Sequence, residues 1–398
     1  MIKELHLKNW KSFGESTLYI DPLSILIGTN ASGKSNVFDA LQFLAKIATG
    51  HTISKSIDSA RGGAAWMIYK KARETTLTAV IETKSNQEYI YEITLSFSED
   101  DKPLIKEESL TQNDLEKKLF YTSPNQADLS SLYTHIYRKG SDDYVEILCL
   151  DAQHSVLHNV KGLNLNQELT QVVTEILSGL AKITFIDPIP LSMRGYAPLS
   201  NVLQSDTANI AGVLAKLKSD ERDKVSEVMV KYLSQLVEQR ITSVWAEPVG
   251  RLGSDAMLYC EESWGEETLL VDARGLSDGT LRFLGIMTAL LTAKEGSLLL
   301  IEEVDNGLHP SRVKVLFDFL QKIGQERKVD VLCTTHNPAF LDALGNEMIL
   351  FVSLVYRDKE TGESKITLLE DLEDLPKIMA RGTLGQVNTA GLLEKSVQ

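Results

Sequence analysis

The chain has 398 residues, of which 43% are apolar and 24% charged, and its net charge at pH 7 is −14. This length can bury a large core in two lobes or domains, and the composition is that of an ordinary globular protein. The negative charge argues against a globally basic surface for nucleic acid, although a local basic patch is compatible with it.

The positions of the cysteines and the lengths of the apolar runs argue against a disulfide-stabilised, zinc-binding or membrane-spanning protein. Cys149, Cys260 and Cys333 lie far apart without a C-x-x-C pair, so we expect buried reduced thiols rather than disulfides or a zinc site. The longest apolar run, residues 284–293, is too short to cross a membrane. The N-terminus alternates like a strand and lacks the apolar core of a signal peptide. We therefore expect a cytoplasmic protein without membrane contact.

Residues 28–35 fit the phosphate-binding pattern G-x-x-x-x-G-K-[ST]. An apolar strand is predicted before them at 23–27 and a helix after them at 36–44. In this arrangement, backbone N–H groups and the helix N-terminus receive phosphates, Lys34 reaches the β- and γ-phosphates, and the Ser35 hydroxyl holds Mg²⁺. Both flanks favour this function over a chance glycine-rich turn. The predicted ATP-binding residues of this loop are Gly28, Asn30, Ala31, Ser32, Gly33, Lys34, Ser35 and Asn36.

Alternating apolar and polar residues predict a β-rich subdomain around the P-loop. The expected strands are 2–9, 16–20, 76–83, 88–97 and 104–110. Residues 111–180 give no clear pattern and no sustained heptads, which excludes a long coiled coil. A strand ending in a proline-rich turn is expected at 184–190, and the apolar spacing over 209–239 predicts two helices that pack on the core.

The C-terminal third alternates between strands and helices, which predicts a parallel sheet covered by helices. Strands are expected at 297–301 and 329–334, and helices at 281–291, 311–323 and 339–344. Glu302 and Glu303 directly follow the first of these strands, as in a Walker B motif. Glu302 would support Mg²⁺, and Glu303 would orient and deprotonate the attacking water. A solvated strand end is the alternative, which the nearby P-loop makes less favourable.

The stretch from Leu276 to Thr280 precedes the helix predicted at 281–291. It is typical of an N-cap turn, and a helix N-terminus also suits a phosphate. The same residues resemble the L-S-x-G signature of ABC-type ATPases, and His336, just past the following strand, resembles their switch histidine.

Three further stretches narrow this resemblance. Residues 9–13 resemble the N-terminal motif of RecF- and SMC-like ATPases. Residues 302–310 and 334–338 resemble stand-alone ABC-type ATPases related to the OLD-family heads, often described only as AAA-type or predicted ATPases. Residues 187–194 and 203–217 also resemble that group. The resemblance therefore covers most of the chain, most weakly over residues 111–180.

The resemblance implies an α/β fold. This fold is an ABC-type P-loop ATPase head with a mixed sheet core, an antiparallel β subdomain and an inserted α-rich subdomain. We expect an N-terminal ATPase lobe at 1–110, an inserted mixed or helical subdomain at 111–260 and a C-terminal ATPase lobe at 261–398. The 241 positions between Ser35 and Leu276 exceed what a compact transporter ATPase needs, so the extra chain would replace the coiled coil of SMC proteins.

The resemblance also implies a head-to-tail dimer that binds ATP and Mg²⁺. The Walker motifs of one subunit and Ser277 and Gly279 of the other would close on one ATP. Residues 306–309 would form the D-loop, and Lys11 would join the nucleotide-binding residues. The implied catalytic residues are Glu303 and His336, and the implied metal-binding residues are Ser35 and Glu302.

The sequence departs from the family pattern at three places. Glu302 stands where most ABC ATPases have Asp, and Val304 and Asp305 replace a commoner Pro-Glu or Pro-Thr. No glutamine can be assigned to the Q-loop: Gln42 comes too early, and Gln87 and Gln112 have no supporting pattern.

Three functions remain open. The first is an ATP hydrolase whose ATP-gated dimer drives a partner in DNA maintenance or in defence against phages and plasmids. Its effector, a nuclease or toxin, would be a separate chain, because the acidic stretch 370–374 is typical of a solvated face. The second is a nucleotide-sensing scaffold with little hydrolysis, which the intact Glu303 disfavours and the unassigned Q-loop weakly favours. A small-metabolite kinase is third, because it needs neither the signature nor the switch histidine.

Overall fold

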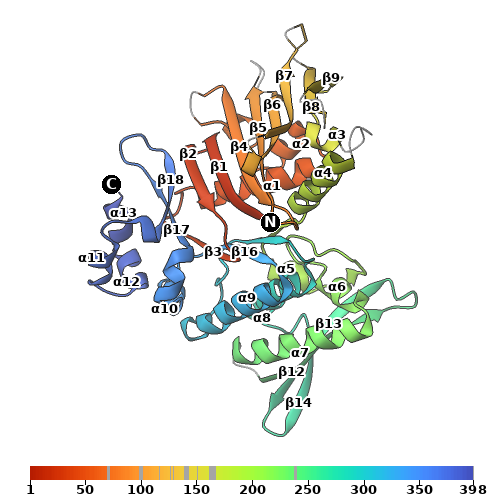
Figure 1. Ribbon diagram of the computed structural model, residues 1–398. Helices are drawn as coiled ribbons and strands as arrows, with labels where there is room; N and C mark the ends of the chain where they lie inside the picture. The colour runs from red at the N-terminus through yellow and green to blue at the C-terminus, as the bar shows by residue number, and fades with distance from the viewer. Residues whose placement is uncertain are drawn as a thin grey trace.

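The computed structural model forms one large mixed sheet with helices on both faces and a second, smaller sheet (Figure 1). Within the described residues, the large sheet has 14 strands and the small sheet has four. No described helix is long and apolar enough to cross a membrane. The structure describes residues 1–69, 72–97, 102–115, 117–125, 127–128, 130–138, 143–149, 151–160, 167–236 and 240–397.

A parallel half of the large sheet positions the site. Its strands are continuous apolar runs, as expected for strands that are covered on both faces. Leu26, Leu300 and Leu332 pack into one core cluster, and their sequence neighbours pack into the other. The carboxyl ends of these strands meet at one edge of the sheet. In spatial order the strands are β10 (Ile183–Ile186), β15 (Leu298–Ile301), β16 (Asp330–Thr334), β3 (Leu23–Ile27) and β17 (Val352–Arg357).

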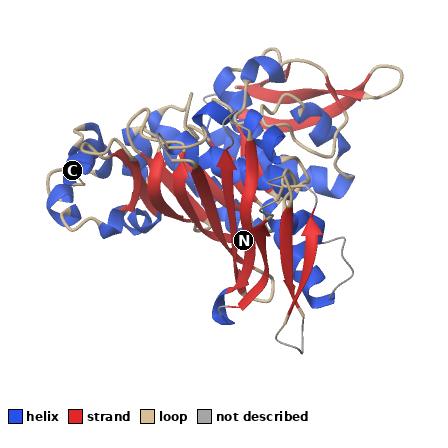
Figure 2. Cartoon of the chain, turned by 90° about the horizontal axis from the view of Figure 1, so that it is seen from above, coloured by secondary structure: helices blue, strands red, loops and turns tan. Residues whose placement is uncertain are grey.

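The other half of the sheet is largely antiparallel and confirms the predicted β-rich subdomain. Strand β18 bridges the halves, because it pairs antiparallel with β17 and parallel with β2. Figure 2 shows the strands of the large sheet side by side. In spatial order this half contains β18 (Ser364–Leu368), β2 (Phe13–Tyr19), β1 (Ile2–Trp10), β4 (Glu74–Glu82), β5 (Glu88–Phe97), β6 (Pro103–Gln112), β7 (Lys117–Pro124), β8 (Leu132–Tyr137) and β9 (Tyr144–Cys149).

Helices cover both faces of the large sheet, as the strand–helix alternation predicts. The first core cluster lies between the sheet and α1 (Lys34–Ala48), α2 (Ile53–Asp58), α3 (Val156–Val160) and α4 (Gln167–Leu180). The second cluster lies under α8 (Asp278–Thr292) and α9 (Val313–Arg327). Short helices gather at the C-terminal end: α10 (Pro338–Ala343), α11 (Leu375–Met379), α12 (Leu384–Thr389) and α13 (Leu392–Ser396). The 3₁₀ helices are η1 (Ala64–Trp66), η2 (Asn113–Leu115), η3 (Pro310–Arg312), η4 (Asn346–Phe351) and η5 (Leu369–Asp371).

The small sheet belongs to a lobe inserted between β10 and α8. Helices α6 and α7 pack on it and cover its apolar face. The lobe extends away from the β4–β9 strands (Figure 1). Its elements are α5 (Pro190–Met193), β11 (Ala197–Pro198), α6 (Ile210–Lys216), α7 (Ser219–Leu236), β12 (Arg240–Val249), β13 (Asp255–Trp264) and β14 (Glu267–Asp272).

Several boundaries differ from the predicted ones. The expected domain limits at 110/111 and 260/261 fall inside β6 and β13, so each would cut a strand, and the division into three units stays a prediction. The strand with a proline-rich end expected at 184–190 is β10, which ends at Ile186, and Pro190 then starts the short helix α5, where its fixed φ and missing N–H are tolerated. The two helices predicted over 209–239 are α6 and α7, and residues 237–239 lie outside the described residues.

The cysteines agree with the expectation where they are described. Cys260 and Cys333 are buried free thiols, whereas the side chain of Cys149 lies outside the described part of the chain. Burial raises the pKa of Cys260 to about 12, and burial raises the pKa of Cys333 further.

Candidate functional site

One cavity of about 660 Å³ at the carboxyl ends of the parallel strands collects most of the predicted nucleotide residues. A larger cavity of about 1520 Å³ lies at the amino ends of the same strands and contains none of them. The predicted residues that line the smaller cavity are Asn30, Ala31, Ser32, Gly33, Lys34, Ser35, Asn36, Glu302, Glu303 and His336. The cavity is also lined by Asp187, Arg282, Asn306, Thr334 and Arg357.

The backbone of the phosphate loop depends on its glycines. Gly28 has φ +142°, and a Cβ there would lie 2.0 Å from the Val355 carbonyl oxygen. Gly33 has φ +118°, and a Cβ there would lie 2.6 Å from Ser364 Oγ. Ala31 also has a left-handed φ of +64°, a strained conformation that is typical of ligand-binding loops. The fold therefore holds this loop in a shape that only this glycine pattern permits.

Three features of the loop fit a bound phosphate. Ser32 Oγ is buried without a hydrogen-bond partner. No side chain caps the start of α1 at Gly33, so the first N–H groups of the helix are available to an anion. The Lys34 ammonium donates to the carbonyl oxygens of Gly28 (2.7 Å) and Thr29 (2.9 Å), directly above the loop. Burial lowers the pKa of Lys34, while the nearby Glu303 and Glu302 oppose that shift.

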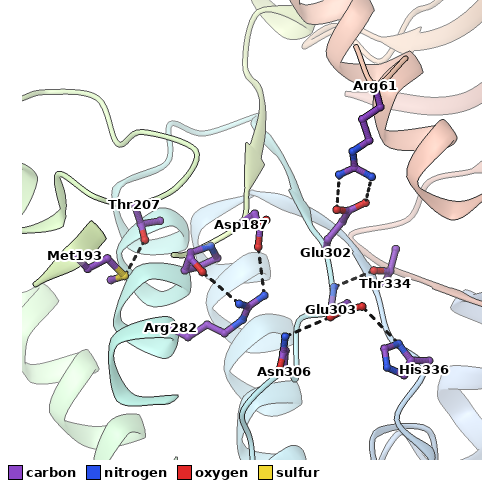
Figure 3. A network of polar contacts seen from close by, with 11 residues as sticks. Arg61, Asp187, Met193, Thr207, Arg282, Glu302, Glu303, Asn306, Thr334 and His336 are labelled. Carbon is purple, nitrogen blue, oxygen red and sulfur yellow. Dashed lines mark hydrogen bonds and ion pairs between the residues drawn. The ribbon is translucent and has the colours of Figure 1, made fainter. Parts of the chain in front are cut away.

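Glu302 follows the last residue of β15, and the side chain of Arg61 points toward its carboxylate (Figure 3). The Arg61 guanidinium donates to both of its carboxylate oxygens, at 3.0 and 2.6 Å. Burial opposes ionisation of Glu302, but hydrogen bonds from Arg61 and Ser35 outweigh it, so the pKa of this carboxyl is lowered. Glu302 is therefore an ionised carboxylate beside the Ser35 hydroxyl, as a magnesium site requires.

Glu303 is held in a strained position next to the switch histidine. Its φ is +46°, unusual for a residue with a side chain, and its N–H donates to Thr334 Oγ1 at 2.9 Å. Its carboxylate accepts from Asn306 Nδ2 at 3.3 Å and lies 3.9 Å from His336 Nδ1 (Figure 3). Because β15 and β16 are neighbours, the Walker B glutamate and the histidine meet at one edge of the sheet.

Ser277 and Gly279 do not line this cavity. Ser277 is exposed and caps α8, with its Oγ accepting from the Thr280 N–H at 3.1 Å. Gly279 packs against the predicted D-loop of its own chain, and a Cβ there would lie 3.0 Å from the Gly307 carbonyl oxygen. The predicted signature motif is thus next to the loop that follows Glu303 and lies outside the lining of the P-loop cavity of the same chain.

The predicted role of Lys11 at the nucleotide is not supported by its position. Its side chain is buried away from the cavity lining, and its ammonium pairs with the Asp39 carboxylate and donates to the Arg61 carbonyl oxygen at 2.7 Å. A buried ammonium needs such partners, and α1 supplies the carboxylate. The neighbouring Trp10 Nε1 donates to the Asn36 carbonyl oxygen at 2.8 Å. This N-terminal motif therefore braces the P-loop helix.

Sequence reasoning missed four charged residues at the site: Asp187, Arg282 and Arg357 line the cavity, and Arg61 contacts Glu302. Asp187 follows β10, the strand next to β15, and burial raises its pKa while Arg282 opposes the shift. Arg282 of α8 lies 3.4 Å from Asp187, and Arg61 pairs with Glu302 at 2.6 Å. A carboxylate after a predicted strand was a visible signal for Asp187, but the strand order was not. No glutamine lines the described cavity, so none of Gln42, Gln87 and Gln112 fills the Q-loop role there.

Metal binding at this site would rest on few protein ligands. Among the described residues, no group of three or more His, Cys, Asp or Glu side chains could hold a metal ion. A magnesium ion here would therefore use Ser35, Glu302, water and nucleotide phosphates, which matches the preference of Mg²⁺ for few protein ligands.

Comparisons with known proteins agree with this geometry. A family described as "AAA ATPase domain" matches residues 1–185, and one described as "AAA domain, putative AbiEii toxin, Type IV TA system" matches residues 219–342. No curated protein sequence matches the chain.

Solved SMC heads share the fold. A crystal structure of an SMC head bound to the C-winged helix domain of ScpA is 13% identical, with a TM-score of 0.53 over 92% of this chain and 96% of that one. An SMC head with an extended coiled coil, bound to the C-terminal domain of ScpA derived from Pyrococcus furiosus, is 11% identical, with a TM-score of 0.50 over 95% of this chain and 99% of that one. The predicted fold class is confirmed. ATPase-domain family models thus match residues 1–185 and residues 219–342, the second of which includes most of the inserted lobe, and the fold of the chain is that of solved SMC heads.

Proposed function

We propose that this protein binds ATP and Mg²⁺ between two head-to-tail subunits and hydrolyses the ATP. One observation carries the proposal: the P-loop, the Walker B glutamates and His336 share one cavity, whereas Ser277 and Gly279 lie outside it. The cavity holds one half of an ABC site, and the exposed signature motif is the other half. In a two-fold dimer, the cavity of one subunit would meet the signature motif of its partner.

The P-loop side binds and orients the nucleotide. Lys34 and the N–H groups at the start of α1 neutralise the phosphates, and Ser32 Oγ gains the partner that it lacks here. Ser35 and Glu302 would hold Mg²⁺, which supplies positive charge to the transferring phosphoryl group. Because Arg61 occupies both oxygens of Glu302, metal and arginine compete for this carboxylate.

Glu303 and His336 act on the attacking water. The Glu303 side chain can accept the proton of water as a general base, and the hydrogen bond from Asn306 orients its carboxylate. His336 lies beside the same carboxylate and can contact the γ-phosphate from the neighbouring strand end. The left-handed backbone at Glu303 aims this side chain into the cavity.

We propose that the ATP-driven dimer gates a separate effector, a nuclease or toxin, in DNA maintenance or in defence against phages and plasmids. Two findings support a partner protein: the similar SMC heads are structures of complexes with ScpA, and a family model that names an AbiEii toxin matches residues 219–342. The net charge of −14 gives no support for nucleic acid as the direct ligand.

The two hydrogen bonds from Arg61 to Glu302 favour a second function, a nucleotide-sensing scaffold that hydrolyses little ATP, because they compete with Mg²⁺ for this carboxylate. The matched pair of wild type and Glu303→Gln separates the two. If the protein is an ATP hydrolase, kcat should fall by about 10²–10⁴-fold in Glu303→Gln, because the amide cannot accept a proton. Nucleotide affinity should stay within about twofold, and light scattering with ATP should give the mass of at least a dimer. Equal kcat values for both proteins would contradict a catalytic Glu303.

A further inference from the structure

Arg194 directly follows α5 and reaches over the loop that leads into the signature motif. Its Nη1 donates to the carbonyl oxygens of Ala273 (3.3 Å), Arg274 (2.8 Å) and Leu276 (2.8 Å). Its Nη2 donates to Asp278 Oδ1 at 2.6 Å. A single guanidinium therefore binds both sides of Ser277 in the sequence.

These contacts set the path of the backbone before α8. Residues 273–277 lie between β14 and α8, where no ladder partner is available to the three carbonyl groups. A planar guanidinium with several fixed donors can satisfy them together, whereas a lysine ammonium lacks this fork. The Arg194 side chain is only 26% exposed, so its position is set by packing as well as by hydrogen bonds.

Arg194 also neutralises a negative charge at the predicted signature motif, that of the Asp278 carboxylate. Asp278 is the first residue of α8, immediately after Ser277, and its side chain is 77% exposed. A carboxylate at a helix N-terminus stabilises the helix, but it repels a phosphate that approaches the same N–H groups. The ion pair with Arg194 neutralises this charge at the place where a phosphate would arrive.

The segment that carries Arg194 is attached to the ATP cavity at its other end. Asp187 lines the cavity and pairs with Arg282, five residues beyond Ser277 on α8, and the Pro188 carbonyl oxygen accepts from Arg282 at 3.2 Å. Residues 187–194 thus hold α8 both at its start and one turn later. This arrangement fixes the signature motif relative to the cavity of its own chain.

We propose that Arg194 is a positioning residue for the signature motif. It holds residues 273–278 in place and neutralises Asp278, so that the start of α8 accepts the γ-phosphate of ATP bound by the partner subunit. This inference rests on the proposed function, because it assumes a site shared between two subunits.

The test compares Arg194→Ala, Arg194→Lys, Asp278→Asn and the double variant Arg194→Ala/Asp278→Asn, each in the Glu303→Gln parent. Nucleotide affinity is measured in dilute protein, and ATP-driven dimerisation is followed by light scattering over a protein concentration series. In Arg194→Ala we expect nucleotide affinity within about twofold of the parent and a rise of about tenfold or more in the concentration needed for the dimer, the scale of a lost hydrogen-bonded charge pair. Kinetics in the wild-type background should show a lower kcat with little change in KM.

The companion variants separate charge from geometry. Asp278→Asn should restore part of the dimer lost in Arg194→Ala, because it removes the unpaired carboxylate. Arg194→Lys keeps the positive charge but not the fork, so its dimerisation should fall between those of the parent and Arg194→Ala. Asp278→Asn alone keeps its shape and should dimerise at least as well as the parent, a result that holds even if Arg194→Ala folds poorly.

Arg274→Ala is the matched control. Its guanidinium lies in the same loop but is exposed and pairs with Asp272, away from Ser277. Dimerisation should therefore match that of the parent. An unchanged dimer in Arg194→Ala, or no rescue by Asp278→Asn, would overturn the role of Arg194 alone. Absence of any ATP-driven dimer in the parent would overturn the proposed function and this inference with it.

Discussion

The ATP cavity and the signature loop are built in different ways, although both belong to one chain. The cavity lies at buried strand ends, its glycines have positive φ, and it leaves Ser32 Oγ without a partner. The signature loop lies at an exposed helix start, and its Ser277 hydroxyl already caps α8. Under the proposed function, this difference would let the cavity bind a nucleotide alone, whereas the predicted signature motif would act only when another molecule brings a phosphate to it.

Lys34→Ala should give the largest loss of ATP affinity, because Lys34 belongs to the P-loop cavity, which is expected to bind ATP without the partner subunit. The variant loses the charged hydrogen bonds to the β- and γ-phosphates, each of which contributes about 1.5–3 kcal/mol. We expect the affinity for ATP to fall by about 100-fold, with loss of dimerisation and turnover. Calorimetry of the single variant is the measurement, and near-native affinity would refute the P-loop assignment.

Ser277→Arg should affect only the signature loop and leave the P-loop cavity of the same chain unchanged. A long side chain would fill the space that a phosphate needs at the start of α8, but it does not touch the cavity of its own chain. Nucleotide affinity of the monomer should stay within about twofold, while ATP-driven dimerisation and hydrolysis are lost.

Mixing the two variants tests whether the halves belong to one shared site. A heterodimer of Lys34→Ala and Ser277→Arg has one site with both lesions and one site with neither. An equal mixture should regain about a quarter of the wild-type turnover if the sites work independently, since half of the dimers carry one intact site. No recovery at any ratio would mean that the site is not shared or that both sites must be intact.

A comparison of two glycines gives the smallest expected effect. Gly279→Ala has an ordinary φ and places a Cβ 3.0 Å from the Gly307 carbonyl oxygen, so a shift of a few tenths of an ångström suffices. We expect a loss of about 1 kcal/mol in unfolding free energy or less, with nucleotide affinity unchanged. Gly28→Ala, with its positive φ and a Cβ only 2.0 Å from the Val355 carbonyl oxygen, should lower the unfolding free energy more and should weaken nucleotide binding. Thermal unfolding and calorimetry of both variants would reveal a reversed order if the comparison is wrong.

The parts of the site that could be predicted are those that lie on contiguous sequence. Lys34, Ser35, Glu302 and Glu303 belong to motifs in which the chemistry and the local backbone coincide, and the parallel strand order then brings them together. His336 was found because it follows a strand with a clear apolar run. The structure places all of them at one edge of the sheet, and their roles stay predictions.

The parts that were missed depend on packing between distant segments. Arg61 and Glu302 are 241 positions apart, and the loop after α2 carries no motif that announces the pair. Asp187 and Arg282 meet because β10 lies beside β15 and because α5, in the segment that follows β10, packs on α8. Lys11 was predicted to bind the nucleotide, but its ammonium forms an ion pair with the buried Asp39 on α1.

The same limit applies to the fold. Strands β7 to β9 lie in the region that gave no clear pattern, although β8 alternates between buried and half-buried residues along its length. The pairing of β6 with β7 carries a register shift between Leu110 and Thr111, which the sequence does not reveal. Residues 139–142 and 161–166, which belong to this region, lie outside the described residues. The helices and strands near the P-loop and Walker B motif were predicted more closely, since their apolar runs are continuous and strongly bounded.

Cross-linking between chains tests the shared site most directly. One chain carries Ala31→Cys in the exposed part of the P-loop, and a second chain of different size carries Ser277→Cys, both in the Glu303→Gln background. The chain with only its native Cys149, Cys260 and Cys333 is the control for cross-links through native thiols, of which Cys260 and Cys333 are buried. A short bis-maleimide should join the two chains into a heterodimer only when ATP and Mg²⁺ are present. The absence of this ATP-dependent product, combined with a cross-link inside a single chain that carries both cysteines, would contradict a site shared between subunits.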